Sequence, residues 1–136
     1  MSYLLDTNVC IAVINGRPRE VVERFDREAL GGAELFVSTI SRFELWYGVA
    51  KSQQQEFNRI RLEIFLAGSV QLLPFGEDDP LRAGEVRALL EKQGTPVGSF
   101  DTLIAGQALA RSLVLVTHNV AEFARVPHLQ VEDWQA

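Results

Sequence analysis

Three carboxylates and one amide share a position in this sequence that could support chemistry. Each lies just beyond a short apolar segment or near the start of a helix that adjoins one; the four residues are Asp6, Glu44, Asp101 and Asn119. Together they would form an all-oxygen ligand set, which suits Mg²⁺ or Mn²⁺ rather than zinc. A divalent cation held by carboxylates polarises a phosphate group and lowers the pKa of a bound water molecule. The pattern therefore predicts a divalent-cation site for phosphodiester chemistry, provided that the fold brings the four side chains together.

Each of these side chains also has a purely structural interpretation. Asp6 or Asn8 could cap the helix that follows it. Ser41 and Glu44 stand at the spacing of a capping box, in which the glutamate returns to the backbone of the serine. Asp101 lies in a first helical turn, where an acid complements the helix dipole. Asn119 stands at the start of a short helix, which its side chain could cap. Capping does not predict an Asp-Thr-Asn run directly after a buried strand, so the common placement of the four favours a site.

The elements that must position these residues alternate along the chain. Apolar strands are predicted at residues 3–5, 35–37, 70–73, 113–116 and 129–131. Helices are predicted at residues 9–14, 18–30, 42–51, 57–67, 79–93, 100–111 and 120–124. Short, all-apolar strands that alternate with helices predict an α/β fold, a parallel β-sheet of about five short strands flanked by helices. In such sheets the site lies at the carboxyl ends of the strands, near the point where strand order reverses.

Length and composition set the class of protein. The 136 residues and 15.2 kDa favour a single domain over residues 1–136. A hydrophobic content of 47% with 23% charged residues excludes a disordered chain. The single cysteine, Cys10, excludes a disulfide framework and a cysteine-based zinc cluster. No apolar run is long enough to span a bilayer, and no basic flank of a signal peptide precedes Asp6, so we expect a cytoplasmic protein without a membrane segment.

The charge balance constrains how such a protein could act on nucleic acid. Thirteen Lys and Arg residues face 18 Asp and Glu residues, for a net charge of −5. Such a chain does not bind nucleic acid through general phosphate neutralisation. Eleven of the thirteen basic residues are arginine, whose guanidinium binds phosphates and carboxylates in bidentate fashion. Binding of nucleic acid would therefore need a localised site, with a metal ion supplying positive charge.

Four segments in order resemble a known family. Residues 4–8 (LLDTN) and 38–48 (STISRFELWYG) resemble the first two motifs of PIN-domain ribonucleases, and residues 98–105 (GSFDTLIA) resemble the third. Residues 115–119 (LVTHN), with Glu122 and Phe123, and residues 126–134 (VPHLQVEDW) resemble the C-terminal signature of VapC-type toxins. Each motif alone is weak, but the ordered set spans residues 4–134 and is specific.

This resemblance implies a PIN-like parallel sheet and divalent-metal-dependent endonucleolytic cleavage of RNA. Carried over by position, the acidic catalytic and metal-binding residues are Asp6, Glu44 and Asp101, with Glu44 acting directly or through water. The supporting residues are Thr7, Asn8 and Thr117, the two threonines through hydroxyl hydrogen bonds. Many PIN domains have an acid where this chain has Asn119, which makes this residue a weak ligand and leaves open whether one metal ion binds or two.

The resemblance also implies partners. It predicts the toxin of a type II toxin–antitoxin system, which inhibits translation and growth, with RNA as substrate. It further implies a homodimer and a VapB-type antitoxin, for which we predict an arginine presented to the acidic site, because an uncompensated carboxylate cluster suits a bidentate guanidinium.

Two other function classes remain as alternatives. One is a catalytically inactive PIN-like binding scaffold, against which the presence of all three acids argues. The other is an aspartate-based phosphatase, whose chemistry requires a second acid two residues after the first, where this chain has Asn8. A response-regulator receiver, of similar α/β outline, would need a lysine after its fifth strand, and no lysine follows Lys92.

Several further residues are interpreted structurally. His118 adjoins the site and could touch a substrate phosphate, but we interpret it as an exposed loop histidine. Phe43, Trp46 and Tyr47 flank the second acid on its helix and are interpreted as core or partner-contact residues. The arginines of residues 17–27 alternate with acids, which predicts a solvated, ion-paired helix.

Overall fold

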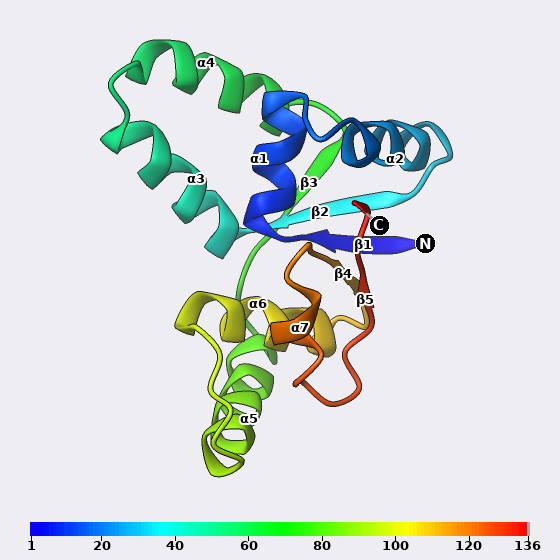
Figure 1. The fold of residues 1–136 in the computed structure, drawn as a ribbon, viewed down its shortest axis with the longest axis vertical. Coiled ribbons are helices and arrows are strands. Elements are labelled where there is room, and N and C mark those ends of the chain that lie inside the picture. The colour runs from blue at the N-terminus through cyan, green and yellow to red at the C-terminus, as the bar shows by residue number, and fades with distance from the viewer. Residues whose placement is uncertain (136) are drawn as a thin grey trace.

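The computed structural model, which describes residues 1–135, contains one five-stranded parallel sheet in the order β3-β2-β1-β4-β5 (Figure 1). Its strands are β1 (Ser2–Leu5), β2 (Glu34–Ser38), β3 (Val70–Leu73), β4 (Val114–Val116) and β5 (Val131–Glu132). Its helices are α1 (Thr7–Asn15), α2 (Arg19–Leu30), α3 (Thr39–Lys51), α4 (Gln55–Leu66), α5 (Asp79–Lys92), α6 (Ser99–Ala110) and α7 (Val120–Phe123). The predicted fold class is confirmed, and the helices and strands lie within a few residues of the predicted ranges. The largest difference at a helix start is in α3, which begins three residues before the predicted start.

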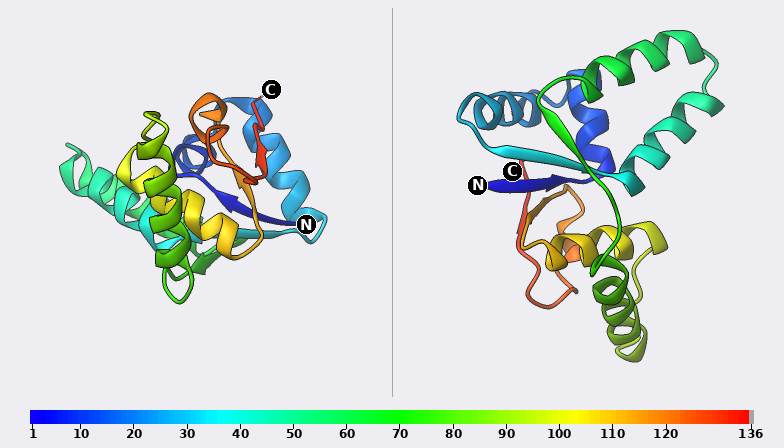
Figure 2. Two further views of the ribbon diagram at one scale, coloured as in Figure 1. Left: turned by 90° about the horizontal axis from the view of Figure 1, so that it is seen from below. Right: turned by 180° about the vertical axis from the view of Figure 1, so that it is seen from behind.

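The two central strands, β1 and β4, are almost entirely apolar and buried because helices cover both faces of the sheet there. Tyr3, Leu4 and Leu5 of the central strand β1 are each no more than 2% exposed. Tyr3 and Leu5 belong to the core beneath helices α1 to α4, and Leu4 belongs to the core beneath α5 to α7. Figures 1 and 2 show these two sets of helices on opposite sides of the sheet. Successive side chains of a strand point to opposite faces of the sheet, so β1 contributes to both cores.

The strand order reverses at β1, which pairs with β2 on one side and β4 on the other. The connections that leave β1, β2 and β4 all start at the same edge of the sheet, because the strands are parallel. Asp6 and Thr117 are the first residues beyond β1 and β4, and Ser38 is the last residue of β2. This edge is where the sequence predicts the site.

The start of α3 differs from the sequence expectation. The helix begins at Thr39, and the Ser38 hydroxyl accepts a hydrogen bond of 3.1 Å from the backbone N–H of Ile40. Ser41 is therefore a fully buried residue inside the helix rather than its cap. The capping-box interpretation of Ser41 and Glu44 is wrong, because Ser38 already caps the helix and Glu44 is free to bind another element.

Helices α5 and α6 pack closely enough to require a glycine. A Cβ atom built on Gly106 would lie 2.4 Å from the Cα atom of Ala83, too close for any side chain. This contact fixes α6 against α5, and with it the first turn of α6, which carries Asp101.

Helix α4 carries an apolar stripe that faces solvent. Phe57, Ile60 and Ile64 lie at helical spacing within the segment predicted as a helix, yet they are 58%, 46% and 67% exposed. Leu62, on another face of the helix, is its buried residue. The spacing thus identified a helix correctly, but its apolar stripe is surface rather than core. Within residues 1–135, no helix combines the length and apolar character needed to cross a membrane.

Candidate active site

Asp6 is fixed at the carboxyl end of β1 by two hydrogen bonds. One carboxylate oxygen, Oδ1, accepts from the backbone N–H of Thr7 at 2.8 Å and so caps α1. The other, Oδ2, accepts from the hydroxyl of Thr117 at 2.8 Å, which comes from the end of the neighbouring strand β4. The side chain is only 5% exposed. The capping interpretation and the site interpretation of Asp6 are therefore both compatible with its position.

Glu44 joins the same edge from the first turns of α3. The hydroxyl of Thr7 donates to Glu44 Oε1 at 2.6 Å and lies 3.0 Å from the hydroxyl oxygen of Ser41. Thr7 is buried and adjoins Asp6, so one residue links the second acid to the first. The two predicted supporting threonines thus each bind one of the predicted acids.

Asp101 completes the set of predicted carboxylates and has the most perturbed acidity. Burial is the main cause that raises the pKa of its carboxyl, and together with the negative charges of Asp6, Glu122 and Glu44 it brings this pKa to about 6. Burial also raises the pKa of Asp6, against the opposing effect of its two hydrogen bonds, and the charges of Glu44 and Glu122 add to the rise. The fold therefore brings the three predicted acids close enough to act on one another electrostatically.

A fourth acid, Glu122, belongs to this group and was not assigned to the site from the sequence. It lies in the first turn of α7, where its Oε2 accepts from Asn119 Nδ2 at 2.5 Å and its Oε1 accepts from the backbone N–H of Gly98 at 3.3 Å. Its charge raises the pKa of both Asp6 and Asp101. The signal was present in the sequence, because a residue three positions after Asn119 on a helix lies on the same face.

Asn119 is near the acids but is arranged differently from the expectation. Its backbone N–H donates to the Thr117 hydroxyl oxygen at 3.0 Å, while its side chain makes no capping bond to α7. The amide nitrogen is turned to Glu122, so Asn119 supports that acid directly. A cap role for the Asn119 side chain is therefore excluded. Asn8, the other predicted supporting amide, is exposed and lines a neighbouring pocket beside Asn119.

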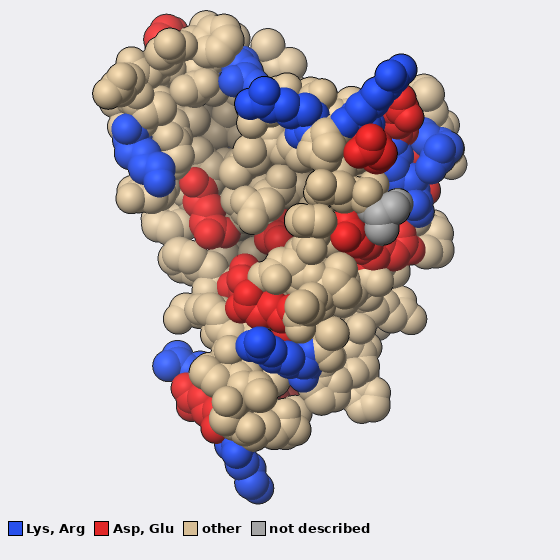
Figure 3. Space-filling view, in the orientation of Figure 1, with Lys and Arg blue, Asp and Glu red and all other residues tan. Residues whose placement is uncertain are grey.

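Among the described residues, no basic side chain forms an ion pair with this cluster. The ion pairs of residues 1–135 involve other acids, and Asp6, Glu44, Asp101 and Glu122 take part in none of them. Figure 3 shows acidic side chains gathered across the middle of one face, between the upper and lower groups of helices, with most Lys and Arg side chains above and below. Crowded carboxylates without a counter-charge attract a cation.

The donor set fits a magnesium-like cation more closely than a zinc-like one. Every candidate ligand is an oxygen atom, and the charges of four carboxylates act on one another. Within residues 1–135, however, the side chains do not form a closed group of three or more His, Cys, Asp or Glu residues positioned to hold a metal ion. Mg²⁺ keeps several water molecules and needs only one or two direct carboxylates, so an open arrangement of this kind suits it.

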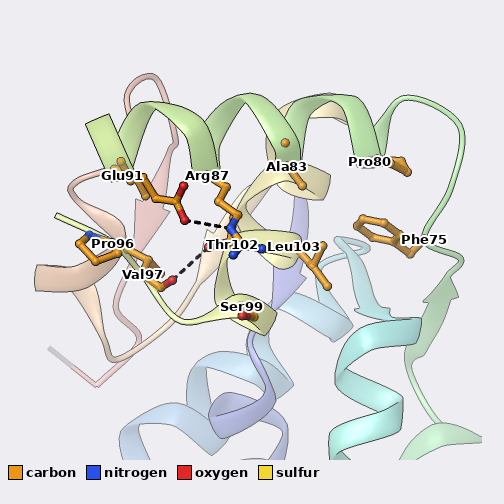
Figure 4. A pocket seen from close by; sticks show the side chains of 12 residues that line it. Phe75, Pro80, Ala83, Arg87, Glu91, Pro96, Val97, Ser99, Thr102 and Leu103 are labelled. Atoms are coloured by element: carbon orange, nitrogen blue, oxygen red, sulfur yellow. Dashed lines mark hydrogen bonds and ion pairs between the residues drawn. The ribbon is translucent and has the colours of Figure 1, made fainter. Parts of the chain in front are cut away.

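A separate cavity of about 470 Å³ lies between α5, α6 and the residues 95–98 that connect them (Figure 4). Phe75, Ala83, Val97 and Leu103 are among its walls, and none of the four acids lines it. This cavity is therefore distinct from the acidic site.

Comparisons with known proteins bear on the family of this chain. The PIN domain family matches residues 3–129. The chain belongs to the PIN-domain family. Among its relatives, the chain is 39% identical over 134 residues to the tRNA(fMet)-specific endonuclease VapC of Salmonella typhimurium and 38% identical to the ribonuclease VapC2 of Rickettsia felis. These alignments cover 98% of this chain and 98% of each relative.

Solved structures of PIN-domain proteins agree with this assignment. The VapBC2 complex of Rickettsia felis bound to promoter DNA aligns with a TM-score of 0.92 at 37% identity, over 98% of this chain and 99% of that one. VapBC-1 of nontypeable Haemophilus influenzae aligns with a TM-score of 0.88 at 38% identity, over the full length of both chains. The chain thus belongs to the PIN-domain family and is similar to VapC-type members over nearly its full length, so the resemblance stated from its motifs is confirmed.

Proposed function

We propose that this PIN-domain protein is a divalent-metal-dependent endoribonuclease that acts as the toxin of a toxin–antitoxin pair in the cytoplasm. The observation that carries the proposal is a cluster of four carboxylates, without a basic partner among residues 1–135, at the carboxyl ends of parallel strands. A scaffold that only bound a partner would have no need of such mutual repulsion. The VapC-type relatives act on RNA, which supports the substrate class.

The roles follow from position and burial. Asp6 and Asp101 would hold Mg²⁺ or Mn²⁺ most directly, because the charge of Asp6 is the carboxylate charge that acts most strongly on Asp101. Glu44, bound to Thr7, and Glu122, bound to Asn119, would bind through water or orient the attacking water. When bound, the cation supplies charge for the phosphoryl oxygens and a water of lowered pKa. Thr117 and Thr7 keep the carboxylates of Asp6 and Glu44 in place.

The proposed antitoxin would bind the groove that ends at Glu44. This groove has a volume of about 200 Å³ and lies between α1, α3 and α4, with Ile11, Leu45 and Leu62 among its walls. The two helices that border this groove carry further exposed apolar side chains, the stripe of α4 and Tyr47 of α3. The neighbours of known structure are VapBC complexes, which supports a VapB-type partner. A partner helix on this groove could carry an arginine past Glu44 to the acids, where a guanidinium pairs with carboxylates.

A homodimer is also part of the proposal. Phe43 of α3 and Phe100 of α6 are 56% and 43% exposed, and their rings pack edge to face at a centroid distance of 5.5 Å. Exposed aromatic pairs of this kind favour burial against a second surface. Sedimentation of the purified chain would test this directly.

The deciding experiment is cleavage of RNA by the purified chain with Mg²⁺, with Mn²⁺, and with a chelator. We expect cleavage in both metals and none in the chelator, and restored activity after metal is added back. Cleavage that persists in chelator would exclude the metal-dependent mechanism. Binding of RNA without cleavage in any metal would favour the inactive-scaffold alternative.

A further inference from the structure

A pocket of about 620 Å³ adjoins the acidic site and is not used by the roles assigned so far. It lies between α1, the start of α2, the β4–α7 connection and the segment after β5. Val9, Val21 and Trp134 provide apolar walls, while Asn8, His118 and Asn119 provide polar groups at its margin. Apolar walls with a few convergent polar groups are typical of small-ligand sites, and this volume is large enough for a nucleotide.

His118 is held at this pocket by a partner distant in sequence. Its Nδ1 lies 3.2 Å from Asp133 Oδ2 and 3.4 Å from Oδ1. A carboxylate can only accept a hydrogen bond, so Nδ1 carries the hydrogen and Nε2 remains without a partner among the described residues. The Asp133 carboxylate also accepts from the backbone N–H of Gln135 at 2.9 Å, which fixes its orientation. The histidine side chain is 65% exposed, so this pairing orients a ring that remains accessible.

The pocket is continuous with the acidic site through two short paths. Asn119, on its margin, binds Glu122 through its side chain and the Thr117 hydroxyl through its backbone, and that hydroxyl binds Asp6. Asn8, which also lines the pocket, follows Asp6 by two residues. A strand of RNA with one phosphodiester at the acids would therefore bring an adjacent nucleotide to this pocket.

We propose that this pocket is a nucleotide subsite, in which the base next to the cleaved phosphodiester of single-stranded RNA packs against the apolar walls and His118, oriented by Asp133, contacts that nucleotide. The inference rests on the proposed ribonuclease function and adds a specificity-determining residue to it. Base contacts with aromatic side chains and with amide groups are how proteins read unpaired RNA. The pocket would thus select which nucleotide flanks the cleaved bond, whereas the acids act on any phosphodiester.

The test compares His118→Ala with a matched histidine variant, His128→Asn. His128 is exposed, lies outside this pocket and has a φ of 68°, a backbone conformation that asparagine tolerates. Binding of a fluorescent, randomised single-stranded RNA is measured for each variant in an Asp101→Asn background, which prevents cleavage. Cleavage products of a defined RNA are sequenced for each variant with the four acids intact.

We expect His118→Ala to weaken RNA binding by about tenfold, the effect of losing one base contact of about 1.4 kcal/mol. It should also relax the nucleotide preference on one side of the cleaved bond, and Asp133→Asn should do so to a smaller extent. His128→Asn should change neither. Equal RNA binding and identical cleavage sites for wild type and His118→Ala would overturn the subsite. The subsite would also be overturned if His118→Ala lost antitoxin binding while its RNA binding and cleavage sites stayed unchanged. If wild type cleaves no RNA but His118→Ala still weakens binding, the nuclease proposal fails and the subsite stands.

Discussion

Two buried aspartates of this molecule, Asp6 and Asp79, have opposite surroundings. Asp79, at the start of α5, is fully buried and accepts hydrogen bonds from the Arg111 guanidinium, from Gln107 Nε2 and from the backbone N–H of Gly76. Asp6 is 5% exposed and accepts from one hydroxyl and one backbone N–H, with other carboxylates nearby.

The difference separates a structural acid from a functional one. Asp79 has a cation at 3.0 Å, and in turn it raises the pKa of Arg111, so this pair ties the start of α5 to the end of α6. Asp6 has no cation among the described residues, and its burial is electrostatically unfavourable in the absence of a bound ion. A buried carboxylate without a basic partner marks a functional site, while one with a complete set of donors marks a structural connection.

Removing a functional carboxylate should give the largest effect. Asp6→Asn, Glu44→Gln and Asp101→Asn should each reduce RNA cleavage by at least about 100-fold, because stabilisation by a bound cation contributes several kcal/mol. The proteins should stay folded, since each amide is close in shape to the acid. Cleavage rates and circular dichroism measure the two properties, with the exposed Asp78→Asn as control. Full cleavage by a folded Asp6→Asn or Asp101→Asn protein would refute the site assignment.

Removing the structural carboxylate should instead affect stability. Asp79→Asn leaves the Arg111 guanidinium without its counter-charge, which we expect to lower the free energy of unfolding by about 2 kcal/mol. The full cost of a broken buried pair is not reached, because the Arg111 side chain is 32% exposed. Urea unfolding gives the change, and Asp78→Asn should stay within about 0.5 kcal/mol of wild type. Loss of cleavage per folded molecule in Asp79→Asn would remove the contrast between the two aspartates.

The raised pKa of Asp101 predicts a pH-dependent stability. Its folded-state pKa of about 6 exceeds the unfolded value of about 3.9, so the folded state binds more protons between these values. Without metal, this group therefore lowers the free energy of unfolding as pH rises from 4 to 6. Asp101→Asn should accordingly gain stability relative to wild type between pH 5 and pH 7, by about 1 kcal/mol after allowance for partial exposure. Thermal melts at both pH values in chelator test this, and an unchanged difference between the two proteins would count against the crowded-acid description.

The smallest expected effect concerns Asn119. Asn119→Asp replaces the donor that binds Glu122 with a fifth negative charge, which should lower the melting temperature without metal. The same charge should strengthen cation binding, so the rise in melting temperature with Mn²⁺ should exceed that of wild type. Melts of both proteins across a Mn²⁺ titration measure the response. Identical titration curves would show that this position does not contribute to cation binding.

Much of the fold could be read from local sequence patterns. Mostly apolar runs of three or four residues bounded by turn residues identified all five strands, because short apolar segments of this kind are typical of strands in a covered sheet. The start of α3 was missed because Ser38 and Ser41 are equally good caps in isolation. Only the tertiary structure shows that β2 runs up to Ser38, so that the helix starts directly after it and Ser41 is buried. Whether the apolar stripe of α4 is buried or exposed could not be predicted either, because periodicity defines a face of a helix but does not indicate which element covers it.

The sequence by itself determined which side chains are available for chemistry, because three acids lie either directly after a strand or in the first turns of a helix, and the ends of parallel strands meet at one edge. Only the tertiary structure decided how those side chains are held and which others join them. Glu122 joins the cluster because the first turn of α7 lies at the same edge of the sheet as Asp6. His118 is paired with Asp133 because β5 lies beside β4 and brings residues 15 positions apart into contact. Such pairings depend on long-range packing, which leaves no periodic signal in the chain itself.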